Sequence, residues 1–186
     1  MWYSTSVRVF GIDPGSRYCG FGAVEDAGGT RVRHLGHGVL SLGEDRPIED
    51  RLRDLYAGLT REIAAHEPDI VAIEDVFHAK NARSALVLGQ ARGVAILAAA
   101  QSGAKIRSFP PSVIKMAVTG SGRAEKEQVG RMVCVLLGIA LPARMDASDA
   151  LAAAICGILR QHVPQAVTVK KQRGDWRMQL ARKVGK

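Results

Sequence analysis

VRVFGIDPGS, Val7 to Ser16, is the stretch that decides the fold. Its first part, Val7 to Ile12, is short and mostly apolar, which indicates a buried β-strand. The Asp-Pro-Gly triplet that follows predicts the turn that ends this strand. An aspartate at the end of a buried strand is costly unless it is paired, bound to a metal or exposed at the edge of the sheet. Asp13 is therefore either an ordinary turn residue or part of a functional site, and the other segments of the sequence are needed to distinguish the two.

Alternating strand and helix patterns continue outward from this first strand. Further strands are predicted over Gly20–Glu25, Arg31–Leu42, Asp69–Glu74 and Lys105–Phe109. Helices are predicted over Ile48–His66, Ser84–Gln101, Ser112–Val118, Ala124–Leu137 and Asp146–Gln161. The first three strands follow one another through short turns, whereas the later strands alternate with helices. This order predicts an α/β fold in which helices flank one mixed five-stranded sheet.

Length and charge predict one domain with a basic extension. The 186 residues contain 47% hydrophobic and 24% charged side chains, a balance that is typical of a soluble globular domain. We expect residues 1–163 to form this domain and residues 164–186 to form a basic tail. Much of the net charge of +8 lies in this tail, because residues 170–186 hold seven Lys or Arg and a single acid. The tail either contacts nucleic acid or is a solvated, poorly ordered terminus.

Several classes of protein are disfavoured. No charged segment followed by an apolar run opens the chain, so we expect no secretory signal. The apolar stretch Ala85–Ala100 is interrupted by Gln90 and Arg92, which argues against a membrane helix and predicts no membrane association. The three cysteines are far apart and odd in number, so we expect free thiols and a cytoplasmic protein.

Three further acids could join Asp13 in a site. Glu74 ends the apolar run DIVAI, and Asp146 and Asp149 lie three residues apart on a predicted helix, where they share a face. The alternative is that Glu74 faces water, that Asp146 caps the helix and that Asp149 favours its positive end. Together the four carboxylates are hard oxygen ligands suited to Mg²⁺ or Mn²⁺. Two such ions can activate water and stabilise the leaving oxygen in phosphodiester cleavage.

Other chemistries fit the sequence less well. No serine, cysteine or histidine nucleophile arrangement stands out, and the five histidines have no metal-ligand spacing. Actin-like ATPases also begin with an apolar strand, an aspartate and a glycine turn. They need a second lobe and a second glycine-rich phosphate loop, and 186 residues leave no room for that lobe and show no such loop. A non-catalytic nucleic-acid-binding module would explain the basic tail but not four acids that repel phosphate.

Four segments resemble the RuvC family of Holliday junction resolvases and occur in the family's order. They are GIDPGSRYCGFG (11–22), AIEDVFHAKNARSALVLGQARG (72–93), GRAEKEQV (122–129) and DASDALAAAI (146–155). GIDPGS alone would be a weak signal, but the ordered set is highly specific. The short N-terminal extension and the tail beyond His162 depart from the family pattern. The nearest alternative is a related ribonuclease H-like nuclease that processes RNA.

The resemblance implies a ribonuclease H-like fold and a homodimer that nicks four-way DNA junctions symmetrically in recombination and repair. The branch-migration proteins RuvA and RuvB are implied as partners. Four positions match the family's catalytic acids and would hold two Mg²⁺ or Mn²⁺ ions: Asp13, Glu74, Asp146 and Asp149. Phe77 matches an aromatic residue that contacts the junction, and Lys115 and Lys126 match basic residues that contact DNA. From the residues alone, Phe77 could instead fold back onto the core, and the lysines could be ordinary exposed residues.

The helix predicted over Ser84–Gln101 is expected to contribute to the dimer interface. It is apolar on nearly every face, and one sheet can cover only one side of it. Gly89 and Gly93 weaken the helix unless close packing offsets their cost. We expect at least one of Ala91 and Ala95 to lie at this interface. The alternative, that the other helices of the same chain cover the remaining faces, stays open.

Overall fold

One mixed sheet of five strands forms the centre of the molecule in the computed structural model, which describes residues 6–43, 45–75 and 81–161. The strands are β1 (Arg8–Asp13), β2 (Tyr18–Asp26), β3 (Val32–Ser41), β4 (Ile70–Glu74) and β5 (Lys105–Phe109), and their order in the sheet is β3-β2-β1-β4-β5. β1, β2 and β3 form an antiparallel meander, while β4 runs parallel to both β1 and β5. The α/β fold with a mixed five-stranded sheet is confirmed.

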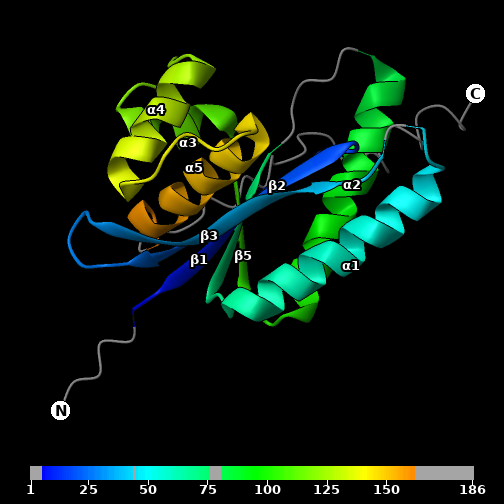
Figure 1. Cartoon of the computed structure of the whole chain (residues 1–186), viewed down its shortest axis with the longest axis horizontal. Coiled ribbons are helices and arrows are strands. Elements are labelled where there is room, and N and C mark those ends of the chain that lie inside the picture. The colour runs from blue at the N-terminus through cyan, green and yellow to red at the C-terminus, as the bar shows by residue number, and fades with distance from the viewer. Residues whose placement is uncertain (1–5, 44, 76–80, 162–186) are drawn as a thin grey trace, which may run out of the picture.

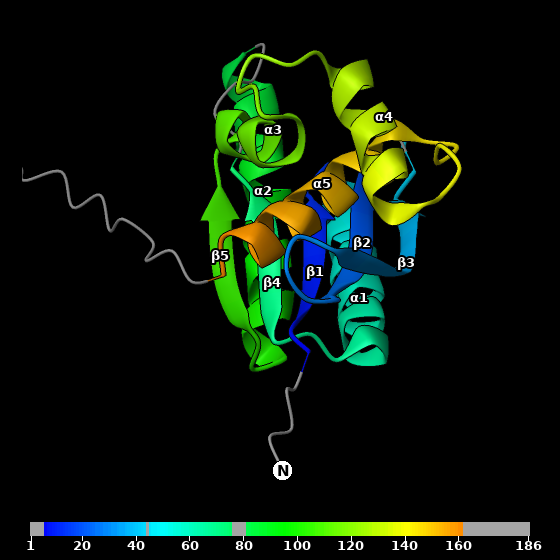
Figure 2. The same cartoon turned by 90° about the vertical axis from the view of Figure 1, so that its left-hand side faces the viewer.

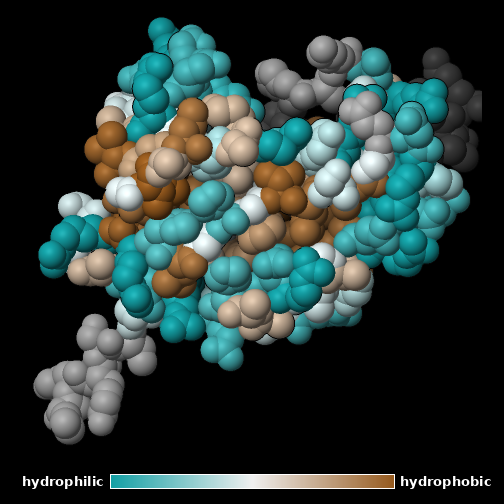
Figure 3. Space-filling model, viewed as in Figure 1, coloured by the Kyte–Doolittle hydropathy of each residue, from teal (hydrophilic) through white to brown (hydrophobic). Residues whose placement is uncertain are grey.

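Helices cover both faces of this sheet (Figures 1 and 2). They are α1 (Ile48–His66), α2 (Ala82–Gln101), α3 (Pro111–Thr119), α4 (Lys126–Leu137) and α5 (Met145–Leu159). α1 and α2 pack side by side on one face, and α5 crosses the other face with α3 and α4 outside it. Figure 2 shows α5 running across β4, β1 and β2. Figure 3, in the same view as Figure 1, shows mainly hydrophilic residues over α1 and a group of hydrophobic residues over α4 and α5. The predicted helices begin and end within a few residues of the observed ones, as expected for ends read from sequence.

The alternation of side chains along each strand divides the core into two clusters. Phe10 and Ile12 of β1 belong to the cluster beneath α1 and α2, whereas Val9 belongs to the cluster beneath α5. The same alternation holds for β4, where Ala72 faces α5 and Ile73 faces the opposite helices. Because successive strand residues point to opposite faces, the last residues of both strands lie on the α5 side.

Glycines on the sheet let α5 approach unusually closely. A Cβ atom at Gly11 would lie 2.7 Å from the backbone nitrogen of Ala154, and one at Gly22 would lie 2.6 Å from the side chain of Leu151. On the helix, a Cβ atom at Gly157 would lie 2.6 Å from the side chain of Val9. Such distances cannot accommodate a side chain, so glycine sets how near α5 can lie to the strand ends.

α2 packs on the core with only one side. Ala91, Ala95, Ala98 and Ala99 are buried, whereas Leu86 is 65% and Leu97 is 51% exposed. In length and composition α2 could also cross a membrane, yet it shares the core of the sheet with α1. The expectation that at least one of Ala91 and Ala95 lies at a dimer interface is wrong, because both alanines are fully buried against their own chain.

Candidate active site

Two of the predicted acids end neighbouring parallel strands. Asp13 is the last residue of β1 and Glu74 is the last residue of β4. The register pairs Ile12 with Ile73, so the two acids follow one paired position and lie side by side on the α5 face of the sheet. The close approach of α5 brings Asp149 to the ends of these two strands. Carboxylates from three distant segments of the chain therefore converge at one edge of the sheet.

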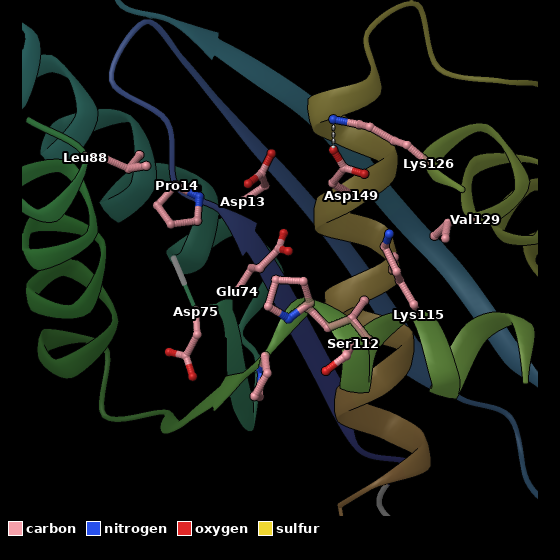
Figure 4. A pocket seen from close by; sticks show the side chains of 14 residues that line it. Asp13, Pro14, Glu74, Asp75, Leu88, Ser112, Lys115, Lys126, Val129 and Asp149 are labelled. Carbon is pink, nitrogen blue, oxygen red and sulfur yellow. Dashed lines mark ion pairs between the residues drawn. The ribbon is translucent and has the colours of Figure 1, made fainter. Parts of the chain in front are cut away.

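These groups open into a cavity of about 710 Å³. Its polar lining consists of four carboxylates, two lysines and one serine: Asp13, Glu74, Asp75, Asp149, Lys115, Lys126 and Ser112. Figure 4 shows the acids of β1, β4 and α5 and the two lysines around this one space. Lys115 comes from α3, and Lys126 is the first residue of α4. The cavity thus combines acids that can bind cations with lysines that can bind anions.

Asp146 lies next to this group but does not line the cavity. The backbone of Asp146 rests against Gly20, which pairs with Asp13 across β1 and β2. Its carboxylate points to Arg144, whose Nε lies 3.0 Å from Asp146 Oδ2. The alternative that Asp146 caps its helix is wrong, because Arg144 occupies the N-cap position and Asp146 lies in the first turn of α5.

The two aspartates of α5 are each paired with a cation. Lys126 Nζ lies 2.5 Å from Asp149 Oδ2, an ion pair that Figure 4 marks with a dashed line. The pair with Arg144 satisfies Asp146 in the same way. Repulsion between the two like charges on one helical turn is therefore offset by neighbouring side chains. Asp13 and Glu74 have no such partner among the ion pairs of the described residues.

The carboxyl groups at the strand ends resist ionisation. Burial, together with the charges of Glu74 and Asp149, raises the pKa of Asp13 to about 8. Burial likewise raises the pKa of Glu74 to about 7, with Asp149 as the next cause. Lys126 opposes both shifts. Because these desolvated carboxylates repel one another, the binding of a cation between them would be strongly favoured.

The donor set of the site suits a hard divalent cation, although the side chains are not arranged as a finished metal site. Among the described residues, no three Asp, Glu, His or Cys side chains converge closely enough to hold a metal ion as they stand. In this arrangement Lys126 and Arg144 each engage one oxygen of a helix aspartate. Carboxylate oxygens without nitrogen or sulfur ligands fit Mg²⁺ or Mn²⁺.

A second acid at the end of β4 was not singled out in the sequence. Asp75 follows Glu74, lines the cavity and accepts a hydrogen bond of 2.6 Å from Arg92 of α2. The same Arg92 nitrogen donates to Ser108 of β5 at 2.9 Å. Arg92 is the only charged residue in the middle of an apolar helix, and this isolation is the sequence signal that could have indicated an acidic partner such as Asp75. It ties α2 to the strand end that carries Glu74.

The other predicted site residues can be placed only in part. Phe77 and the tail over 164–186 lie outside the described residues. No histidine of the described part lines the cavity. His34, His37 and His66 belong to β3 and α1, and the His66 ring packs 5.6 Å from Phe10 on the opposite face of the sheet. The three cysteines are free, as expected.

The sequence of the chain was compared with those of known proteins. The sequence profile described as Crossover junction endodeoxyribonuclease RuvC matches residues 9–157. A protein of that name from Trichlorobacter lovleyi is 47% identical over 92% of this chain and 98% of its own length. One from Myxococcus xanthus is 48% identical over 90% of this chain and 89% of its own.

A solved structure shares the fold as well. The Thermus thermophilus RuvC in complex with Holliday junction substrate superposes with a TM-score of 0.79 at 30% identity, covering 83% of this chain and 94% of the other. The ribonuclease H-like architecture expected from the sequence motifs is thereby confirmed.

Proposed function

Since the chain belongs to the RuvC family of crossover junction endodeoxyribonucleases, we propose that the cavity between the ends of β1 and β4 and helix α5 is its phosphodiesterase site. The chain is a DNA endonuclease of this family, and its substrate is the four-way Holliday junction, which it resolves by paired nicks. One observation carries the choice of site. Three of the four predicted acids, from three distant segments, face one cavity together with both predicted lysines.

The acids would hold the catalytic metal, on which enzymes of this family depend. We assign Asp13, Glu74, Asp146 and Asp149 as its ligands and propose two Mg²⁺ or Mn²⁺ ions. Such ions would lower the pKa of an attacking water and stabilise charge on the phosphodiester oxygens. The raised pKa values of Asp13 and Glu74 support this assignment, because burial and neighbouring carboxylates outweigh the opposing charge of Lys126 at both groups.

The lysines would bind the DNA strand. Lys115 and Lys126 bring positive charge from α3 and α4 to the wall of a cavity that is otherwise acidic. A phosphate entering this cavity needs that charge, since four carboxylates alone would repel it. Lys126 Nζ pairs with one oxygen of Asp149, and its ammonium group has three N–H donors, so it can also donate to a phosphate oxygen. Phe77, three positions after Glu74 in the sequence, is proposed to stack on a base of the junction.

The enzyme is proposed to act as a two-fold dimer through the outer face of α2. Leu86, Gly93 and Leu97 are exposed on that face, and a Cβ atom at Gly93 would meet no atom within 4 Å. The close packing that would offset the cost of this glycine is therefore not supplied within the described chain. A second copy of α2 would supply it, and a two-fold dimer would present two equivalent sites to the two equivalent strands of a junction.

Four finer assignments complete the proposal and concern the partners, the location, the domain and the tail. RuvA and RuvB are proposed as partners that deliver the junction, and the cytoplasm is proposed as the location. We also propose that residues 1–163 form the nuclease domain and that the basic tail over 164–186 adds affinity for DNA through its charge.

Cleavage and binding assays on the same variants test the proposed site. Asp13→Asn and Glu74→Gln should abolish cutting of a four-way junction in Mg²⁺ or Mn²⁺ while binding in a gel-shift assay persists or tightens, because a charge that repels phosphate is gone. Glu49→Gln, which removes an exposed acid of α1, is the control and should cut normally. Plain duplex DNA and structured RNA should be poor substrates. Wild-type cleavage rates in either site variant would exclude the assignment.

A further inference from the structure

Arg144 is held in place at the rim of the site by two contacts. Its guanidinium carbon lies 3.5 Å from the centre of the Tyr18 ring, and its Nε donates to Asp146 Oδ2 at 3.0 Å. Tyr18 begins β2, directly after the turn that follows Asp13. Arg144 is the N-cap residue of α5. The contact therefore joins the strand meander to the helix that carries two of the proposed metal ligands.

The stacking on Tyr18 separates this pair from an ordinary surface ion pair. The side chain of Arg144 is 44% exposed, and a free arginine at such a position loses considerable rotamer entropy when it pairs. The flat tyrosine ring orients the guanidinium before any pairing, so less freedom is lost when Nε meets the carboxylate. No such ring is needed to explain the pair between Lys126 and Asp149, which lies inside the cavity.

We propose that Arg144, braced by Tyr18, is a built-in competitor of the divalent ion at Asp146 and so raises the ion concentration that the enzyme needs. The proposal rests on the proposed role of Asp146 as a metal ligand. A guanidinium that engages one carboxylate oxygen reduces the share of that group available to a metal, and its charge repels an approaching cation. The competition is partial, because the hydrogen bond uses Oδ2 and leaves Oδ1 to another partner.

The size of the effect follows from the exposure of the pair. Part-exposed ion pairs are weakened by solvent, so removing Arg144 should tighten ion binding by about two- to fivefold rather than by orders of magnitude. The same change should make ion binding more sensitive to salt, since in wild type salt weakens the competing pair as well as the attraction between ion and carboxylate, and without Arg144 only the second effect remains. Removing only the ring of Tyr18 should act in the same direction but less strongly, because Arg144 would remain charged but less well oriented.

Direct binding of Mn²⁺ to the DNA-free protein, followed by the electron paramagnetic resonance of the free ion, tests the proposal without any cleavage assay. Arg144→Gln should bind Mn²⁺ about two- to fivefold more tightly than wild type. Tyr18→Leu should show a smaller gain, whereas Tyr18→Phe, which keeps the ring face, should match wild type. Arg123→Gln removes an exposed arginine that has no acid partner among the ion pairs of the described residues. It is the matched control for net charge and should also match wild type.

The outcomes separate this proposal from the assignment of the site. Unchanged or weaker Mn²⁺ binding in Arg144→Gln, with a melting temperature that shows the variant is folded, overturns the proposal. An equal gain in Arg123→Gln overturns it too, because the effect would then be one of overall charge. Asp146→Asn should weaken binding. If it does so while Arg144→Gln has no effect, the metal ligand stands and only the competition fails. If Asp146→Asn binds Mn²⁺ as wild type does, the assignment of Asp146 fails.

Discussion

Gly11 of β1 and Ala154 of α5 are in such close contact that a Cβ atom at position 11 would lie 2.7 Å from the Ala154 nitrogen. The same atom would also collide with the backbone carbonyl of Ala150. Neither obstacle can rotate away, since both are backbone atoms within a buried helix. The contact links fold and function, because the position of α5 determines where Asp146 and Asp149 stand relative to the strand ends.

Gly11→Ala should therefore both destabilise the protein and impair the site. Overpacking of this kind costs up to about 3 kcal/mol, which corresponds to a drop of roughly 6–12 °C in melting temperature for a chain of this size. Gly22→Ala is the graded control, because its Cβ atom would meet chiefly the side chain of Leu151, which can rotate. Calorimetry should show a smaller loss for Gly22→Ala. Equal melting temperatures for Gly11→Ala and wild type would contradict the close approach of α5.

The stability of the metal-free protein should fall as the pH rises. Asp13 and Glu74 have folded-state pKa values of about 8 and about 7, above the ordinary values of 3.8 and 4.5. The folded state thus binds protons more tightly than the unfolded state. The stability that this proton binding contributes to the folded state is complete below about pH 4 and is lost as the pH rises through about 7 and 8.

Melting curves in a chelator at pH 5, 7 and 9 check this expectation. Asp13→Asn should differ little from wild type at pH 5 but melt several degrees higher at pH 9, because it removes a buried charge without a partner. Added Mg²⁺ or Mn²⁺ should stabilise wild type at pH 9 more than the variant. If wild type and Asp13→Asn keep the same difference at every pH, the burial of this carboxyl does not act as described.

The pair between Arg92 and Asp75 should couple α2 to the strand end that carries Glu74. Its two side chains are 26% and 22% exposed, so removing one partner leaves a charge that is largely desolvated. We expect Arg92→Met and Asp75→Asn each to cost about 1–3 kcal/mol of unfolding free energy. The double variant should cost less than the sum of the two. A double-mutant cycle in urea measures the coupling, and strict additivity would show that the pair contributes nothing beyond its separate parts.

A charge on the outer face of α2 should separate the proposed dimer. Leu97→Glu changes a residue that is 51% exposed, so the monomer should stay folded while the apolar interface is lost. Leu141→Glu is the control, because Leu141 is similarly exposed at 57% but lies in the loop before α5. Light scattering at micromolar concentration should give twice the chain mass for wild type and Leu141→Glu and the chain mass for Leu97→Glu. A wild-type monomer that still makes paired nicks would contradict the dimer.

Much of the fold could be predicted from the sequence because its signals are local. Apolar runs that end at Asp13 and Glu74, and the helical spacing of the segments between strands, identify each element from its own residues. Alternation along β1 and β4 then requires both acids to lie on one face once the strands are neighbours. Asp13 and Glu74 could be named as candidate ligands for the same reason, since acids at the ends of apolar strands stand out in the sequence, and Asp146 and Asp149 stand out by their spacing on one helical face.

What only the tertiary structure decided are pairings between distant segments. The sequence contains Lys126 and Asp149, but their pairing depends on how α4 and α5 pack together. The packing of α5 near β2 likewise places Arg144 on Tyr18. A bulge in β3 similarly brings ring nitrogens of His34 and His37 to 2.9 Å, although their spacing predicts no such contact in a regular strand. The periodicity of a segment indicates which face of its own helix or strand each residue occupies. The contact partner of a side chain, and the distance to it, depend on residues far away in the chain, and no local sequence pattern encodes them.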